Sequence, residues 1–272
     1  METGPGRHPV VAAEGWKLTV HFVGAGPGAA DLLTLRAVTM LRRADVCLYP
    51  GTYIDEHVLS HCREDAVLVD TRDLDLDRIV GRLVEAHEAG RDVVRLCSGD
   101  PSIYSALAEQ TSRLDEHGVP WDVTPGVPAY AAAAALLGRE LTVPTLAQSV
   151  VLTRTRARSS VMPESESLAA FAATRATLVL HLAVTRVREL ARELTGEYGP
   201  GCPVAVVANA SQPSELVLTG TLADIADQVE AHGLRQAAVI LVGPALDADL
   251  RRGRESYLYD PRRPRKGSAG RD

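Results

Sequence analysis

Short apolar runs alternate with helical patterns along most of the chain. In the first half, the runs that predict buried strands are Leu18–Val23, Asp45–Tyr49, Ala66–Val69, Val93–Cys97 and Trp121–Thr124. Between them apolar residues recur at helical spacing, most clearly from Leu76 to His87, before a stop at Gly90. Helices are also predicted over Leu33–Arg43 and Ser102–Glu116. This alternation indicates an α/β domain with a mostly parallel sheet and helices on both faces.

A second alternating set follows a break at Gly138–Pro144, which we interpret as a linker because Pro144 disfavours helix before it. Its predicted strands are Ser149–Thr153, Thr177–Leu182, Val204–Asn209, Glu215–Leu218 and Ala237–Val242, and its predicted helices are Leu168–Ala173, Arg186–Leu194 and one that opens at Thr221–Asp224. No internal repeat is found. Two different α/β domains are therefore expected, at 17–140 and 141–250, with flexible tails at 1–16 and 251–272.

Composition narrows the functional class. Of 272 residues, 46% are hydrophobic and 24% charged, as in ordinary folded proteins. The net charge of -6 disfavours a nucleic-acid partner, because such proteins normally carry a basic surplus. No apolar run approaches the roughly 20 residues of a membrane helix, and Met1–Gly15 lacks the apolar block of a signal peptide. Four widely spaced cysteines predict reduced thiols in a cytoplasmic protein, without a metal site.

The first predicted strand runs into a glycine-rich loop, Gly24–Ala29 (GAGPGA). This G-x-G-x-x-A pattern between a strand and a helix is typical of a dinucleotide site. Two features disfavour that interpretation. Pro27 removes a backbone N–H from the loop, and the second strand ends in Tyr49-Pro50-Gly51 rather than in an acidic residue. A tight turn that lets strand and helix pack closely is the alternative.

Two further loops follow predicted strands. Ser98–Tyr104 (SGDPSIY) contains Asp100, which could accept hydrogen bonds from a ligand or could cap the following helix with Pro101 in its first turn. Pro125–Ala129 (PGVPA) is by itself a turn. Because carboxyl ends of parallel strands lie at one edge of a sheet, the three loops together predict a ligand crevice.

The order and spacing of five segments resemble those of the tetrapyrrole (corrin/porphyrin) methylases. The segments are Gly24–Asp31, Ala44–Tyr49, Ser98–Tyr104, Pro125–Ala129 and Val206–Ser211. Members of this family are S-adenosylmethionine-dependent enzymes of cobalamin and sirohaem synthesis. The resemblance spans roughly Leu18–Leu246, nearly all of the chain between the predicted tails.

Within the family, the group that methylates C-11 of precorrin-4 is the most similar. The similarity rests on Ser98–Tyr104, on Gln148–Arg158 (QSVVLTRTRAR) and on Pro163–Leu168 (PESESL). Pro50 also stands where the uroporphyrinogen-III methylases usually have an acidic residue.

The resemblance implies two α/β domains of the tetrapyrrole methylase type, with the active site in the cleft between them. It implies S-adenosyl-L-methionine as cofactor, with S-adenosyl-L-homocysteine as product, a tetrapyrrole substrate and a homodimer. The implied cofactor contacts are Pro27, Ser98, Gly99, Asp100, Ile103, Tyr104, Pro128, Ala129, Leu182 and Ala210.

The substrate's carboxylates need cations, and Arg154 and Arg156 are the candidates because they point to one side of a predicted strand end. A solvated basic loop is the alternative. No catalytic residue is assigned, since the sulfonium is already a good leaving group. Other substrates remain open, namely precorrin-2, precorrin-3, uroporphyrinogen-III or the substrate of diphthine synthase. A nicotinamide-dependent oxidoreductase is the alternative from another class.

Overall fold

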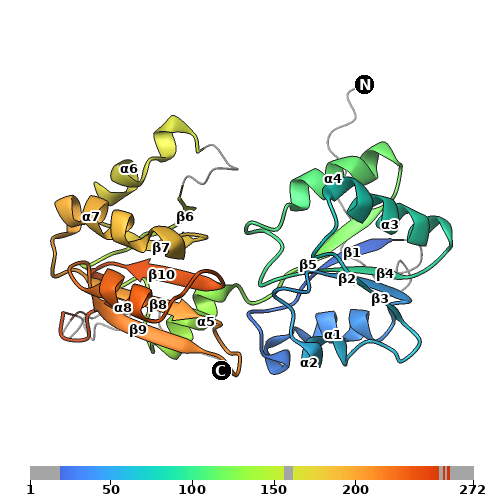
Figure 1. Ribbon diagram of the computed structural model, residues 1–272, viewed down its shortest axis with the longest axis horizontal. Helices are drawn as coiled ribbons and strands as arrows, with labels where there is room; N and C mark the ends of the chain where they lie inside the picture. The colour runs from blue at the N-terminus through green and yellow to red at the C-terminus, as the bar shows by residue number, and fades with distance from the viewer. Residues whose placement is uncertain (1–18, 156–161, 251–253, 255, 258–272) are drawn as a thin grey trace, which may run out of the picture. The chain divides into compact units, whose positions relative to one another are not determined.

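The structure, a computed structural model, describes residues 19–155, 162–250, 254 and 256–257 (Figure 1). Within these residues the chain forms two compact units. The first runs to Ala132 and also contains Asn209–Glu215, and the second holds the remainder. The boundary expected at residue 140 therefore lies inside the second unit. The expected tails fall outside the described residues, except for 254, 256 and 257.

The first unit is built on a five-stranded parallel sheet with the order β3-β2-β4-β1-β5. Its strands are β1 (Val20–Gly24), β2 (Val46–Tyr49), β3 (Val67–Asp70), β4 (Val93–Cys97) and β5 (Trp121–Thr124). Helices α3 (Leu76–Glu88) and α4 (Leu107–Glu116) cover one face, and α1 (Leu35–Leu41) and α2 (Glu56–Leu59) cover the other (Figure 1). The parallel α/β prediction is confirmed.

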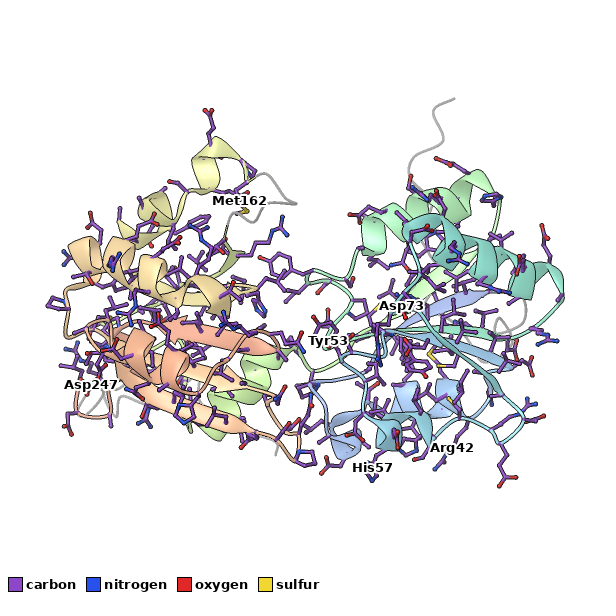
Figure 2. The ribbon with its side chains drawn as sticks, viewed as in Figure 1. Arg42, Tyr53, His57, Asp73, Met162 and Asp247 are labelled. Carbon is purple, nitrogen blue, oxygen red and sulfur yellow. The ribbon has the colours of Figure 1, made fainter. Side chains whose placement is uncertain are left out.

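Alternation along the strands explains why both faces are covered. In β1, Val20 and Phe22 pack with α3 and α4, whereas Val23 packs with α1 on the opposite face. All five residues of β1 are buried, as expected for an inner strand of a parallel sheet. Side chains fill the space between the sheet and its helices (Figure 2).

The second unit contains a mixed sheet with the order β6-β7-β10-β8-β9, in which only β6 and β7 are parallel neighbours. Its strands are β6 (Val150–Arg154), β7 (Thr177–His181), β8 (Pro203–Ala208), β9 (Leu216–Thr221) and β10 (Ala238–Val242). The helices that share its main core are α6 (Leu168–Ala172), α7 (Val187–Tyr198) and α8 (Ile225–Ala231). No helix among the described residues is both long and apolar enough to cross a membrane.

The ends of several elements differ between the sequence prediction and the structure. The helix predicted from Ser102 begins only at Leu107, because the preceding residues form a turn. The alanine-rich stretch after the third loop forms α5 (Ala129–Leu136), and four short 3-10 helices complete the fold: η1 (Ala30–Leu32), η2 (Glu164–Glu166), η3 (Val184–Arg186) and η4 (Pro244–Leu246).

Candidate functional site

Three loops meet at the carboxyl edge of the first sheet. They follow β1, β4 and β5, which are neighbours because β1 lies between the other two strands. The amide of Gly26 donates to the carbonyl of Gly99 at 3.1 Å, and the amide of Gly99 donates back to Gly26 at 2.8 Å. The first two loops are therefore joined by a small antiparallel bridge.

Glycine is required where the loops cross. A Cβ added to Gly24 would lie 2.5 Å from the Cα of Gly126 and 2.8 Å from the carbonyl oxygen of Gly99. A Cβ added to Gly126 would overlap the same carbonyl oxygen. Because these neighbours are backbone atoms, they cannot move aside as a side chain could. The three loops thus form one closely packed backbone surface.

Asp100 fastens the second loop to the third. Its Oδ1 accepts hydrogen bonds from the amide of Ser102 at 2.8 Å and from the Ser102 hydroxyl. Its Oδ2 accepts a hydrogen bond from the amide of Gly126 at 2.9 Å. Partial burial acts to raise the pKa of Asp100, but the bonds from Ser102 and Gly126 together outweigh burial and leave that pKa lowered.

The alternative role for Asp100, capping the next helix, is wrong. Helix α4 begins at Leu107, and its N-cap is Ala106, which supplies no side-chain hydrogen bond. Asp100 instead holds an anionic carboxylate at the junction of two loops.

The glycine-rich loop has already used most of its backbone donors. The pairs are Ala25 N to Cys97 O at 2.8 Å, Gly26 N to Gly99 O at 3.1 Å and Ala29 N to Ser211 Oγ at 3.1 Å. Pro27 has no N–H, and the first α-helix after the loop begins only at Leu35. A pyrophosphate needs free amides at a helix N-terminus, so this loop is poorly suited to a dinucleotide. It fits better a cofactor that has no phosphate.

Asn209–Glu215 lies against the glycine-rich loop although it is almost 200 residues away in sequence. The Gln212 side-chain amide donates to the carbonyl of Pro27 at 3.2 Å, and Ser211 accepts the bond from Ala29 described above. Both Asn209 and Ser211 have left-handed backbones, with φ of 48° and 65°. The structure therefore brings the segment that contains Ala210 beside Pro27, within the first unit.

The remaining predicted cofactor residues of the first unit differ in exposure. Ser98 and Tyr104 are exposed, whereas Gly99 and Pro27 are buried. Those partly buried are Asp100, Ile103, Pro128 and Ala129. Tyr104 is 47% exposed and has a φ of 54°, an unusual combination for a large side chain.

In the second unit, Arg154 and Leu182 lie at one edge of the sheet. Arg154 ends β6 and is the register partner of His181, which ends β7. Leu182 follows with a φ of 53° and is 61% exposed. Burial lowers the pKa of His181, which keeps its imidazole neutral at pH 7. Arg156 falls outside the described residues.

Strand β8 ends at the same edge of this sheet. It runs parallel to β7, since each pairs antiparallel with β10. The chain therefore leaves β8 at Ala208, on the edge that carries Arg154 and Leu182, and enters Asn209–Glu215. The sequence did not reveal Gln212, because a bond between a glutamine and a carbonyl 185 residues away leaves no local pattern.

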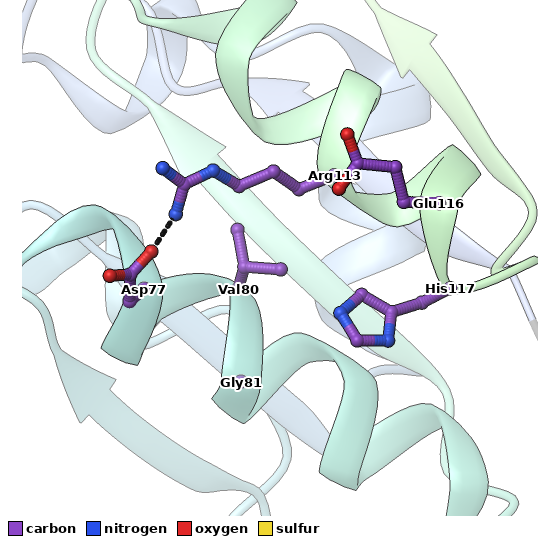
Figure 3. Close-up of a pocket in the computed structure, with 6 residues that line it drawn as sticks. All are labelled: Asp77, Val80, Gly81, Arg113, Glu116 and His117. Atoms are coloured by element: carbon purple, nitrogen blue, oxygen red, sulfur yellow. Dashed lines mark hydrogen bonds and ion pairs between the residues drawn. The ribbon is translucent and has the colours of Figure 1, made fainter.

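A hollow between α3 and α4 lies apart from these residues (Figure 3). Its lining is mostly polar and includes an ion pair between Asp77 and Arg113. The six lining residues are Asp77, Val80, Gly81, Arg113, Glu116 and His117, and none is a predicted site residue.

The chain is similar to known proteins over most of its length. The family model described as Tetrapyrrole (Corrin/Porphyrin) Methylases matches residues 19–226. A precorrin-4 C(11)-methyltransferase of Rhodococcus erythropolis is 53% identical over 248 residues, covering 91% of this chain and 99% of that protein. A cobalt-precorrin-4 C(11)-methyltransferase of Methanocaldococcus jannaschii is 38% identical, covering 84% of this chain and 88% of that protein.

Solved structures agree with these relatives. An X-ray structure of a cobalt-precorrin-4 methyltransferase has a TM-score of 0.82 at 34% identity and covers 88% of this chain and 100% of its own. A uroporphyrin-III C-methyltransferase of Thermus thermophilus, in complex with S-adenosylhomocysteine, has a TM-score of 0.70 at 32% identity and covers 84% and 93%. The chain belongs to the tetrapyrrole (corrin/porphyrin) methylases.

Proposed function

We propose that this protein transfers a methyl group from S-adenosyl-L-methionine to C-11 of precorrin-4, or of cobalt-precorrin-4, in cobalamin biosynthesis. Five relatives named precorrin-4 C(11)-methyltransferase, at 45–53% identity over about nine-tenths of the chain, support the substrate. The observation that carries the cofactor is the junction of three loops, whose amides bond to one another and leave little to hold a phosphate.

The proposed cofactor site follows from that junction. S-adenosylmethionine carries a sulfonium cation, an amino-acid tail and an adenosine but no phosphate. Close backbone contact at Gly99 and an ionised carboxylate at Asp100 suit such a ligand. The residues proposed to hold it are Pro27, Ser98, Gly99, Asp100, Ile103, Tyr104, Pro128, Ala129, Leu182 and Ala210.

The cofactor, when bound, supplies an activated methyl group on a good leaving group. The protein then has to align the reactants and exclude water, and orientation alone can contribute on the order of 7–11 kcal/mol. Tyr104 and Leu182, large exposed side chains at residues with positive φ, would exclude water from the reacting atoms. No side chain is assigned as a general base.

Arg154, with Arg156, is proposed to bind carboxylates of the substrate. Arginine binds carboxylates in a bidentate manner, and Arg154 stands at the strand edge that also carries Leu182. Replacing both arginines with glutamine should weaken tetrapyrrole binding and leave the affinity for S-adenosylhomocysteine unchanged. Unaltered turnover at limiting tetrapyrrole would remove both residues from the site.

Calorimetry with S-adenosylhomocysteine, followed by mass spectrometry of the reaction products, tests the proposal. We expect binding of S-adenosylhomocysteine, no thermal stabilisation by NAD or NADP, and methylation of enzymatically prepared precorrin-4 or its cobalt complex. Methylation of only precorrin-2, precorrin-3 or uroporphyrinogen-III would refute precorrin-4 as the substrate. Stabilisation by a nicotinamide nucleotide alone would overturn the reaction class.

We also infer a homodimer in the cytoplasm. The cysteines in the described part of the chain, Cys47, Cys62, Cys97 and Cys202, are all free thiols, which is consistent with a reducing compartment. The dimer rests on the family resemblance alone. Light scattering during size-exclusion chromatography tests it, and a monomer mass would refute it.

A further inference from the structure

A buried arginine in the middle of β4 has only neutral partners. Arg95 is 7% exposed, and its Nε donates to Oε1 of Gln110 at 3.0 Å. Its Nη1 donates to the Thr71 hydroxyl oxygen at 3.2 Å. No carboxylate of the described residues lies within ion-pair distance of Arg95, and burial lowers its pKa. Because an unpaired buried cation is costly, this arrangement calls for an explanation.

Gln110, in α4, is the residue through which Arg95 reaches the candidate site. Gln110 is 2% exposed, and its Nε2 donates to the carbonyls of Ala106 at 3.0 Å and Ser105 at 3.3 Å. The guanidinium can only donate, so the amide oxygen of Gln110 must face it. The amide NH₂ must then face the two carbonyls, which fixes the orientation of this side chain.

Those two carbonyls belong to a strained turn. Tyr104 and Ala106 both have a φ of 54°, a left-handed conformation that side chains other than glycine disfavour. Ala106 is the N-cap of α4, and its side chain supplies no capping hydrogen bond. The hydrogen bonds from Gln110 are therefore made to the segment whose backbone conformation is strained.

The other arm of Arg95 is anchored in the sheet. The Thr71 hydroxyl that accepts from Arg95 itself donates to the carbonyl of Tyr49 at 3.1 Å. Thr71 follows β3 and Tyr49 ends β2, so the guanidinium is held at the carboxyl edge of the sheet.

We propose that Arg95 and Gln110 are positioning residues that hold the turn Tyr104–Ala106, and with it Ile103 and Tyr104, in the conformation that receives the cofactor. The identity of that cofactor rests on the proposed function. Arg95 would act by fixing the orientation of the Gln110 amide, and neither side chain would touch the ligand.

The proposal explains why glutamine stands opposite arginine. A glutamate at 110 would give Arg95 the missing counter-ion, with a stronger charge-assisted hydrogen bond. An ionised glutamate, however, has no N–H for the carbonyls of Ser105 and Ala106. Residue 110 can thus either provide a counter-ion for Arg95, as glutamate, or donate hydrogen bonds to the carbonyls of the turn, as glutamine.

The substitution Gln110→Glu separates the two roles. At pH 8, where the new carboxylate is ionised beside Arg95, we expect the melting temperature to stay equal to or above that of the control Gln148→Glu. Gln148 is an exposed glutamine that donates only a long bond, at 3.4 Å, to its neighbour's carbonyl. We expect the Kd for S-adenosylhomocysteine to rise about tenfold in Gln110→Glu, which corresponds to about 1.4 kcal/mol.

Hydrogen exchange of the unliganded protein supplies a measurement that needs no cofactor. Amides of residues 102–107 should exchange faster in Gln110→Glu than in the wild type or in Gln148→Glu. Glycine adopts a positive φ without strain. Adding Ala106→Gly to the Gln110→Glu protein should therefore restore much of the lost affinity for S-adenosylhomocysteine. Should Gln110→Glu fail to fold, Arg95→Lys, which keeps the charge but loses the planar fork, should give the same local increase in exchange.

Unchanged exchange and unchanged affinity in these variants would overturn the proposal. A uniform increase in exchange across the first unit, with a lower melting temperature, would also overturn it, because Gln110 would then be only structural. If the wild type did not bind S-adenosylhomocysteine, the proposed cofactor would be wrong. The exchange rates would still decide whether Arg95 and Gln110 hold the turn.

Discussion

Asp100→Asn should loosen the junction of the three loops. The carboxylate accepts from the amide of Gly126 through one oxygen and from Ser102 through the other. Asparagine can place its oxygen on one side only, so its NH₂ group must face a backbone N–H on the other. Hydrogen bonds to a charged group contribute about 1.5–3 kcal/mol each.

We expect Asp100→Asn to lower the free energy of unfolding by about 2 kcal/mol. This value lies toward the low end of the range for bonds to a charged group, because the carboxyl of Asp100 is only partly buried. For a chain of this size, that change lowers the melting temperature by roughly 4–8 °C. Thermal unfolding followed by circular dichroism measures it. Asp73→Asn is the matched control, since Asp73 is exposed and its carboxylate bonds to none of the described residues (Figure 2).

The effect should depend on pH in a defined direction. The folded pKa of Asp100 is lowered from its ordinary value of 3.8, so its stabilising contribution is complete above that value. The contribution is lost as pH falls through the folded pKa. The difference between wild type and Asp100→Asn should therefore be constant from pH 8 to about pH 5 and shrink below about pH 4. Equal melting temperatures for Asp100→Asn and Asp73→Asn at pH 7 would refute the reasoning.

Three further predictions concern the same unit. Gly126→Ala should destabilise the protein by about 1–3 kcal/mol, because the added Cβ would overlap backbone atoms. Gly81→Ala, in open space within α3 (Figure 3), should stabilise the protein by about 0.5–1 kcal/mol. Chemical denaturation measures both free energies of unfolding, and equal effects of the two substitutions would contradict the close packing at Gly126. Ser211→Ala should speed limited proteolysis within 209–215, and an unchanged cleavage rate would show that its bond to Ala29 does not fasten the segment. Cys62 should be alkylated first at pH 8, since a hydrogen bond from the Cys47 thiol outweighs burial and lowers the pKa of Cys62. Burial raises the pKa of Cys97 to about 11. Mass spectrometry identifies the modified thiol, and earlier labelling of Cys97 would contradict this order.

Local sequence predicted most of the strands and the loops at their ends. An inner strand such as β2 is an uninterrupted apolar run, Val46–Tyr49, so its burial on both faces is visible in the sequence. The second sheet was harder, because short apolar runs carry no information about their direction. The structure shows that three of its four pairings are antiparallel.

The features that sequence reasoning missed depend on contacts between distant residues. The turn before Leu107 contains residues that tolerate helix, and it is held by the hydrogen bond that Gln110 donates to the carbonyl of Ala106 and by the one that Asp100 accepts from the amide of Ser102. The role of Asp100 was left open between capping and ligand binding, because both use the same Asp-Pro sequence. Its bond to Gly126 becomes visible only when β4 and β5 flank β1.

The membership of Asn209–Glu215 in the first unit has a consequence for how the protein is made. Because the chain returns to the first unit after building three strands of the second, the ribosome must synthesise 215 residues before the first unit has all its parts. A fragment that ends at Ala132 would contain the complete parallel sheet but would leave the carbonyl of Pro27 and the amide of Ala29 without their partners. The glycine-rich loop can therefore gain these two partners only after Ser211 and Gln212 have been synthesised.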